Sequence, residues 1–303
     1  MDFRDGARLD TSQVRDVRGR GGMGGGRGMA VGGGGLGIVG LLIALVLGVN
    51  PADLGGAGGP DTAYQDPGAG GGYSAPGAGG LSEVEQNCQT GADADQREDC
   101  RLVAVVNSVQ DYWSGALEGY TPSETTLFRG SVETGCGGAT SAVGPFYCPA
   151  DQGVYIDLDF FDVLETQYGA SGGDFAQAYV LAHEYGHHVQ NLTGQSEASR
   201  RLPDQEGPQG ASVRLELQAD CYAGVWAANA ESQGLITFDD SDIQEGLSAA
   251  SAVGDDRIQE KAQGRVTPES WTHGSAKQRQ TWFETGLRAG DPRACDTFAA
   301  PQV

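Results

Sequence analysis

Hydrophobic residues recur at helical spacing in several stretches of the chain beyond residue 81. In the first stretch, residues 94–116, Leu102, Val105, Val109 and Trp113 share one helical face. The same pattern predicts further helices over residues 175–191, 211–231, 242–262 and 276–289. The region is therefore expected to be mainly helical.

Polar residues at the starts of three of these helices are typical caps. Asp174 can cap the helix that begins at residue 175. Ser241 with Gln244, and Ser275 with Gln278, have the spacing of capping boxes, in which two side chains satisfy backbone N–H groups reciprocally. We therefore expect helices to begin at these positions.

Two other regions carry β-type patterns. Residues 126–132 predict a strand, and in residues 144–157 two β-rich stretches flank a turn of Pro, Asp and Gly, which predicts a hairpin. The expected fold class is therefore α+β: a mainly helical domain with a small sheet or hairpin.

An uncharged apolar segment precedes this domain. Residues 28–52 carry no charge, and nearby arginines all come before them, which favours a membrane-spanning helix over residues 29–50 with a cytoplasmic tail at 1–28. A cleaved secretory signal is the alternative reading. Residues 51–80 are rich in Gly, Pro and Ala, a composition that predicts a disordered linker. Residues 81–303 then form the predicted domain.

The formal net charge of −22 excludes one class of partner. The first 50 residues hold six Arg and four Asp, which leaves 13 basic and 37 acidic residues for the remainder. Because that surface lacks the basic stripe that phosphate groups need, we expect no nucleic-acid partner.

Six cysteines occur, and none forms a CxxC pair. Cys88 with Cys100, and Cys136 with Cys148, share the same separation, and Cys221 with Cys295 would complete three disulfides, although six cysteines allow 15 connectivities. Disulfides indicate an oxidising compartment. Six reduced core thiols are the alternative.

The chain contains one H-E-x-x-H motif, on the helix predicted for residues 175–191. His183 and His187 are four residues apart, so both imidazoles lie on one face and can reach one metal ion. Glu184 is rotated toward the position of a water molecule, where it can act as a base. His188 is one residue out of phase, and we interpret it as a surface residue or a neighbour of the ligands.

A catalytic zinc site needs a third protein ligand. Glu216 lies on the next predicted helix among apolar neighbours, where a metal explains a carboxylate better than solvent does. Asp220 is one turn further along the same face, placed to accept the spare N–H of a ligand histidine. Ordinary exposed helix residues are the alternative for both acids.

Four segments in order resemble the bacterial neutral zinc metallopeptidases, small gluzincins predicted to carry one N-terminal membrane segment: HEYGHH, ELQAD, GPFYCPAD with VYIDLDFF, and HGS followed by QR. The likeness covers about residues 81–300. It implies a zincin-like fold with the sheet or hairpin beside the active-site helix, a Zn²⁺ cofactor and a peptide or protein substrate. It also implies His183, His187 and Glu216 as zinc ligands and Glu184 as catalytic base.

The expected reaction is peptide-bond hydrolysis, in which Glu184 takes a proton from water and passes it to the leaving amine. His273 is the candidate donor to the tetrahedral intermediate, and Tyr222 is a second candidate. A histidine near a helix cap and a core tyrosine are the alternative readings.

Extended substrates can pair with an edge strand beside the active-site helix, and the candidate strand lies around residues 154–158. Asp157 and Asp159 lie on one of its faces. A strand that only completes a sheet is the alternative.

The sequence therefore predicts a membrane-anchored peptidase, with its N-terminus in the cytoplasm and its catalytic domain outside. Two other functions stay open. One is a zinc-containing binding or scaffold domain at the membrane without turnover, and the other is hydrolysis of another amide, such as a cell-wall linkage.

Overall fold

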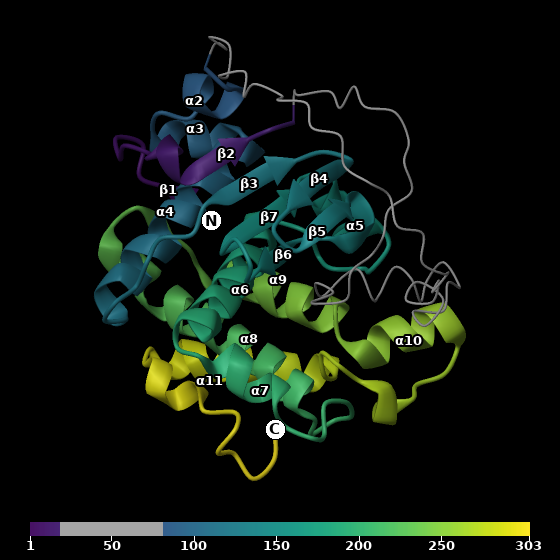
Figure 1. Cartoon of the computed structure of the whole chain (residues 1–303). Coiled ribbons are helices and arrows are strands. Elements are labelled where there is room, and N and C mark those ends of the chain that lie inside the picture. The colour runs from purple at the N-terminus through teal and green to yellow at the C-terminus, as the bar shows by residue number, and fades with distance from the viewer. Residues whose placement is uncertain (19–80) are drawn as a thin grey trace, which may run out of the picture.

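Helices make up most of the part of the chain that the structure describes. The computed structural model describes residues 1–18 and 81–303. The helices are α2 (Glu83–Asn87), α3 (Gly91–Gln96), α4 (Glu98–Ala116), α5 (Asp159–Thr166), α6 (Asp174–Leu192), α7 (Gln195–Arg200), α8 (Ala211–Ala230), α9 (Asp240–Ala252), α10 (Asp255–Gln263) and α11 (Ala276–Ala289). In Figure 1, α6 runs through the middle, with α8 and α11 on one side of it and the strands on the other.

The strands form three small sheets. The largest has the order β2 (Val14–Asp16), β3 (Thr125–Phe128), β7 (Gly153–Asp157) and β6 (Phe146–Cys148). Its first three strands are parallel, and β6 is antiparallel to β7. The other two are antiparallel pairs, β4 (Ser131–Thr134) with β5 (Gly137–Thr140) and β1 (Asp2–Phe3) with β8 (Ile236–Thr237).

The predicted hairpin is observed as β6 and β7, but the predicted substrate strand is wrong. Residues 154–158 mostly form β7, which lies between β3 and β6, so its backbone groups are already paired on both sides. Asp157 is buried and accepts hydrogen bonds from the backbone N–H groups of Gly130 and Asp159, so it has a structural role. The edge strand next to α6 is β6.

Several helices begin or end at other residues than predicted. In each case the chain turns within a stretch whose hydrophobic residues keep helical spacing throughout. The stretch 94–116 breaks at Arg97, which has extended backbone between α3 and α4. The stretch 242–262 divides into α9 and α10, and α9 is capped by a box of Asp239 and Asp242 in place of Ser241 and Gln244. The box of Ser275 with Gln278 is confirmed at the start of α11.

The N-terminal part of the predicted fold needs correction. Strand β1 pairs with β8 and β2 joins the large sheet, so residues 1–18 belong to the same folded unit as residues 81–303 (Figure 1, purple). Among the helices that the structure describes, none has the length and apolar character to cross a bilayer. The helix expected over residues 29–50 and the linker at 51–80 lie outside the described residues, so the membrane-spanning helix is not part of the observed fold.

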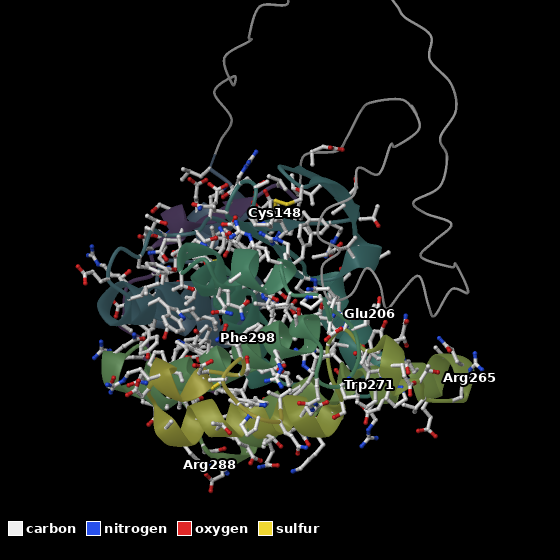
Figure 2. All side chains as sticks on the ribbon, turned by 60° about the horizontal axis from the view of Figure 1, so that its bottom comes forward. Cys148, Glu206, Arg265, Trp271, Arg288 and Phe298 are labelled. Atoms are coloured by element: carbon white, nitrogen blue, oxygen red, sulfur yellow. A yellow bond between two sulfur atoms is a disulfide. The ribbon has the colours of Figure 1, made fainter. Side chains whose placement is uncertain are left out.

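Close helix packing builds the core. A Cβ on Gly224 of α8 would lie 2.1 Å from the Phe283 carbonyl oxygen, and one on Gly286 of α11 would lie 1.9 Å from that of Cys221. Only glycine allows α8 and α11 to approach this closely. Figure 2 shows side chains filling the space between the elements, whereas Arg265 and Arg288 lie at the periphery.

Three disulfides stabilise this arrangement, and their pairing is as predicted. Cys88 is bonded to Cys100, Cys136 to Cys148, and Cys221 to Cys295. The third bond closes the longest loop, because its cysteines are separated by 74 positions in the chain. It joins α8 to the segment after α11.

Candidate metal centre and active site

The candidate site forms where α6 and α8 come together. Gly172 and Gly173, both with positive φ, lead into α6, and Gly194 with φ 76° follows it. A Cβ on Gly186 would lie only 3.0 Å from Cα of Ala219 on α8. The glycine between the two histidines of the motif therefore brings the backbone of α8 close to them.

The structure brings together the three side chains that the sequence predicted as ligands. Nε2 of His183 lies 3.2 Å from one carboxylate oxygen of Glu216, and Nε2 of His187 lies 3.5 Å from the other. One ligand atom from each residue lies within 4.8 Å of the others. All three side chains are at most 14% exposed, so the group lies in a mostly dry environment.

The other nitrogen of each imidazole is fixed by a neighbour. Nδ1 of His183 donates to Asp220 at 2.8 Å, and Nδ1 of His187 donates to Gln190 at 2.9 Å. Gln190 is itself held by the Leu215 carbonyl oxygen on α8. With the protons on Nδ1, both imidazoles turn a lone pair on Nε2 toward Glu216.

Charges in the group are strongly coupled. Burial alone would raise the pKa of Glu216, but the adjacent imidazoles lower it well below its ordinary range. Burial alone would lower the pKa of His187, but the carboxylate of Glu216 raises it to about 9. The buried carboxylate therefore needs a positive partner, which the imidazoles supply when they are protonated and which a bound cation would supply when they are neutral.

These donors fit a zinc ion. Zinc binds imidazole nitrogen and carboxylate oxygen at about 2.0–2.2 Å, and a tetrahedron of that size has edges of about 3.4 Å. The nitrogen–oxygen separations of 3.2 and 3.5 Å are of this size, although each runs to a different oxygen of Glu216. Catalytic zinc sites have three protein ligands and one open position, whereas structural sites are closed by four.

Glu184 lies beside this group and is only 2% exposed. Burial raises the pKa of its carboxyl above the ordinary value, although the charges of His187 and His183 oppose the shift. A pocket with mostly apolar walls opens next to Glu184 and His183. A carboxyl group with a raised pKa next to a pocket can exchange protons with a bound molecule.

Sequence reasoning placed Asp220 correctly near a ligand histidine but missed its other partners. Arg279 of α11 is fully buried and donates to both oxygens of Asp220, at 2.8 and 2.9 Å. The hydroxyl of Tyr179 donates to Asp220 at 2.5 Å. Together, Arg279 and His183 hold the pKa of Asp220 at about 2 against the effect of burial. The QR pair that contributed to the family resemblance was the available signal for Arg279.

His273 lies in the turn before α11. Its Nδ1 is 3.1 Å from Asp255, which also accepts the backbone N–H of His273 at 2.7 Å. A Cβ on the next residue, Gly274, would lie 3.1 Å from Val213 and 3.4 Å from Leu217, so this turn packs against α8 beside Glu216. Asp255 therefore fixes the imidazole in a turn that packs on the ligand helix.

Two other residues have different surroundings from those expected. His188 is fully buried, with Nε2 bonded to the Thr121 carbonyl oxygen and Nδ1 to the Tyr147 hydroxyl of β6, so it joins α6 to the edge strand. Tyr222 packs edge-on against Trp113, at 5.3 Å between ring centres. Tyr222 is therefore partly buried and packs against the hydrophobic core.

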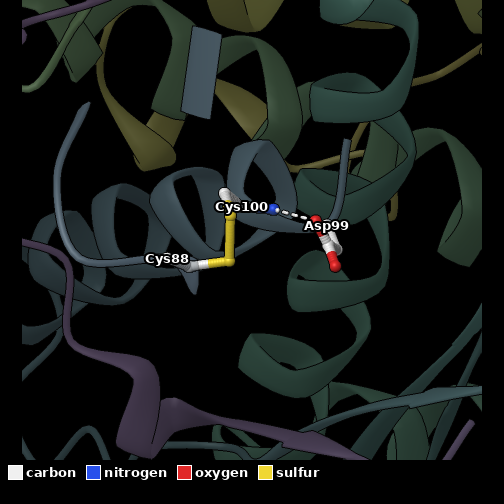
Figure 3. Close-up of side chains that lie close together, drawn as sticks. All are labelled: Cys88, Asp99 and Cys100. Atoms are coloured by element: carbon white, nitrogen blue, oxygen red, sulfur yellow. Dashed lines mark hydrogen bonds between the residues drawn. A yellow bond between two sulfur atoms is a disulfide. The ribbon is translucent and has the colours of Figure 1, made fainter. Parts of the chain in front are cut away.

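A second cluster of potential ligands does not form a metal site. Cys88, Asp99 and Cys100 lie together, as Figure 3 shows, but the two sulfur atoms are bonded to each other. Asp99 accepts bonds from the guanidinium groups of Arg18 and Arg97. These atoms are therefore already engaged in structural bonds.

Comparisons with known proteins agree with this geometry. A family model described as "Putative neutral zinc metallopeptidase" matches residues 1–298. The chain is 56% identical to the uncharacterized protein Rv2575 of Mycobacterium tuberculosis over 224 residues, which are 71% of this chain and 76% of the relative. It is 47% identical to the uncharacterized protein YpfJ of Escherichia coli over 201 residues, which are 64% of this chain and 69% of the relative. No solved structure gives a significant match.

Proposed function

Because the chain belongs to the family of neutral zinc metallopeptidases, whose cofactor is Zn²⁺, we propose that it hydrolyses peptide bonds in peptides or proteins outside the cytoplasm. The observation that carries the proposal is the group of two imidazoles and one carboxylate with the buried Glu184 carboxyl beside it. A zinc site that served only structure or binding would not need a base at this place.

Each residue of the site has a proposed role. His183, His187 and Glu216 would hold the zinc, which when bound supplies Lewis acidity toward a water molecule and a carbonyl oxygen. Glu184 takes a proton from the attacking water and later gives it to the leaving amine nitrogen. The buried position of Glu184 at the pocket supports both steps, because a peptide bound there would lie within reach of the carboxyl group.

His273 is proposed as the donor to the negative oxygen that develops in the transition state. The packing of its turn against α8, the helix of Glu216, and its bond to Asp255 support this role, since Asp255 orients the ring. We expect His273→Ala to lower kcat by roughly 10²-fold while zinc content stays at one ion per chain. An unchanged kcat would remove His273 from the mechanism.

The disulfides support the proposed compartment. All six cysteines are paired, and such bonds persist in oxidising environments. We therefore propose that the domain works outside the cytoplasm. Thiol alkylation of the protein in intact cells, followed by mass spectrometry, should find all six cysteines protected.

The decisive experiment compares the full chain with Glu184→Gln on a mixed peptide library. We expect the wild type to cleave peptides, to lose activity with a chelator and to regain it with zinc. Glu184→Gln should lower kcat by about 10²-fold or more without loss of zinc. Glu197→Gln is the matched control, because Glu197 is exposed on α7, and it should behave as the wild type.

Two results would contradict the proposal. One is zinc-loaded wild-type protein that cleaves none of the peptides. The other is cleavage that Glu184→Gln and Glu197→Gln support equally, because a base beside the metal would then have no part in the reaction.

A further inference from the structure

The apolar pocket beside Glu184 has walls from parts of the chain that are distant in sequence. Pro145 precedes β6, Phe160 lies on α5, Val180 lies on α6 and Val253 follows α9. All four side chains are buried, with Phe160 4% and Val253 7% exposed. These four residues, here called the pocket walls, contribute a lining that is almost entirely carbon.

Three of the four polar side chains that line the pocket have partners elsewhere, and the fourth is the Glu184 carboxyl. Arg279 is neutralised by Asp220, and the Tyr179 hydroxyl donates to the same carboxylate. His183 also donates to Asp220 through Nδ1. Apart from Glu184, which the proposed reaction uses, the lining offers no free partner, so a charged or strongly polar side chain would lose its hydration there at a cost. The pocket therefore favours an apolar occupant.

The size of the pocket limits that occupant. Its free volume is about 20 Å³. Because one water needs roughly 10–15 Å³ on this measure, the space holds only a small group such as a methyl or an isopropyl. A leucine or phenylalanine side chain would require the Phe160 ring to move out of its buried position.

The pocket is also placed where a substrate side chain would lie. Its wall includes Glu184 and His183, the proposed base and a proposed zinc ligand. A peptide that presented its scissile carbonyl to these groups would place one of the two flanking side chains within reach of the pocket. Occupation of the pocket would thereby align the bond with Glu184.

We propose that this pocket selects substrates with a small aliphatic side chain, of alanine to valine size, next to the bond that is cut. The inference rests on the proposed function and deepens it, because it names the class of residue at the cleavage site. Phe160, the largest of the pocket walls, sets the size limit together with Val253.

The test uses peptides that differ at one flanking position, with glycine, alanine, valine, leucine, phenylalanine or aspartate there. We expect the full-length wild type to cleave the alanine and valine peptides with kcat/KM roughly tenfold or more above the leucine, phenylalanine and aspartate peptides. Phe160→Ala should shift the preference toward leucine and phenylalanine by about tenfold.

Phe161→Ala is the matched control, because Phe161 is the neighbouring buried phenylalanine of α5 and does not line the pocket. It should keep the wild-type ranking. Val253→Leu is the second variant, because it adds one methylene to the pocket wall and so reduces the free volume. It should shift the preference toward glycine and alanine.

Binding separates a failure of this inference from a failure of the proposed function. The same peptides are bound to zinc-loaded Glu184→Gln, and their affinities are measured by fluorescence anisotropy. If the wild type cleaves nothing, the proposed function fails, but the affinities still rank the side chains. Stronger binding or faster cleavage of aspartate or phenylalanine peptides by the unmodified pocket would overturn the inference, as would equal shifts in Phe160→Ala and Phe161→Ala.

Discussion

Gly186 stands between the two histidines of the motif, and its missing side chain sets how closely the ligand helices approach. Atoms of Ala219 lie at 3.0 and 3.1 Å from the place where a Cβ would be. Since real Cβ atoms rarely come this close to backbone, any larger residue would push α8 away from α6. Glu216 lies on α8 and would move with it.

We therefore predict that Gly186→Ala lowers the free energy of unfolding by about 1–3 kcal/mol and weakens zinc binding. Differential scanning calorimetry and a competition assay with a zinc chelator would measure both. Gly115→Ala is the matched control, because nothing lies within 4 Å of a Cβ at this helical position. It should be neutral or stabilise the protein by about 0.5–1 kcal/mol. Equal effects of the two substitutions would contradict this account.

Asp220 connects the ligand His183 with Arg279, and both partners are buried. Removing its charge leaves the guanidinium without a counter-ion in the core. We predict that Asp220→Asn lowers the free energy of unfolding by roughly 3–5 kcal/mol, and that zinc affinity falls by about 10–100-fold.

Chemical denaturation and zinc titration of Asp220→Asn, Arg279→Met and the double variant would complete a double-mutant cycle. The double variant should lose less free energy of unfolding than the two single variants lose in sum, because it leaves no unpaired charge. Strict additivity would show that the two residues act independently.

At the scale of elements, helix α8 is held in place by two neighbouring helices and by a disulfide. It contacts α6 through Gly186 and Ala219, and it contacts α11 through two glycines. Cys221, directly after Asp220, bonds it to Cys295. This bond closes a loop of 74 positions, compared with 12 for the bond between Cys136 and Cys148 in the β hairpin region.

Loop length predicts the order in which the disulfides stabilise the protein. Replacing Cys221 and Cys295 by alanine should cost about 4 kcal/mol, compared with about 3 kcal/mol for the same change at Cys136 and Cys148, because the longer loop restricts the unfolded chain more. Urea denaturation of the two double variants measures the difference. We expect weaker zinc binding only when Cys221 and Cys295 are replaced. Weaker zinc binding after replacement of Cys136 and Cys148 alone would contradict the role given to α8.

At the scale of the whole molecule, the first 18 residues are held to the domain by a buried ion pair as well as by strands. Arg18 lies 2.7 Å from Asp16 and 2.9 Å from Asp99 of α4. Burial alone would raise the pKa values of both carboxyl groups, but the guanidinium groups of Arg18 and, for Asp99, Arg97 lower them.

A lowered pKa in the folded state gives stability that is present above the unfolded value, near 3.9, and is lost as pH falls through the folded value. We predict that Arg18→Ala lowers the free energy of unfolding by about 1–3 kcal/mol at pH 7, and that the difference from the wild type shrinks below about pH 4.

Urea denaturation at several pH values tests this expectation. Arg15→Ala is the control, because Arg15 and Glu124 are 3.8 Å apart and each 56% exposed, so their pair contributes little. A difference for Arg18→Ala that stayed constant down to pH 3 would show that the ion pair is not its source.

The sequence by itself determined the local chemistry. The family resemblance is confirmed, and His183 and His187 share one face of α6, because ligands four residues apart on one helix need only that helix to form. Glu216 joins them from α8, so the packing of the two helices decides its place. Two of the disulfide pairings were suggested by spacing, since cysteines that are near in sequence close short loops, and the third was the remaining pair.

Only the tertiary structure decided what depends on contacts between distant segments. The buried Arg279, the central position of β7 and the attachment of residues 1–18 all arise from packing between distant parts of the chain. From charge and hydropathy, the N-terminal residues were predicted to be a tail separate from the domain. The sequence does not show whether an arginine is exposed to solvent or forms an ion pair. The partner of Arg18 lies 81 positions away, and a pattern read within a short window does not contain it.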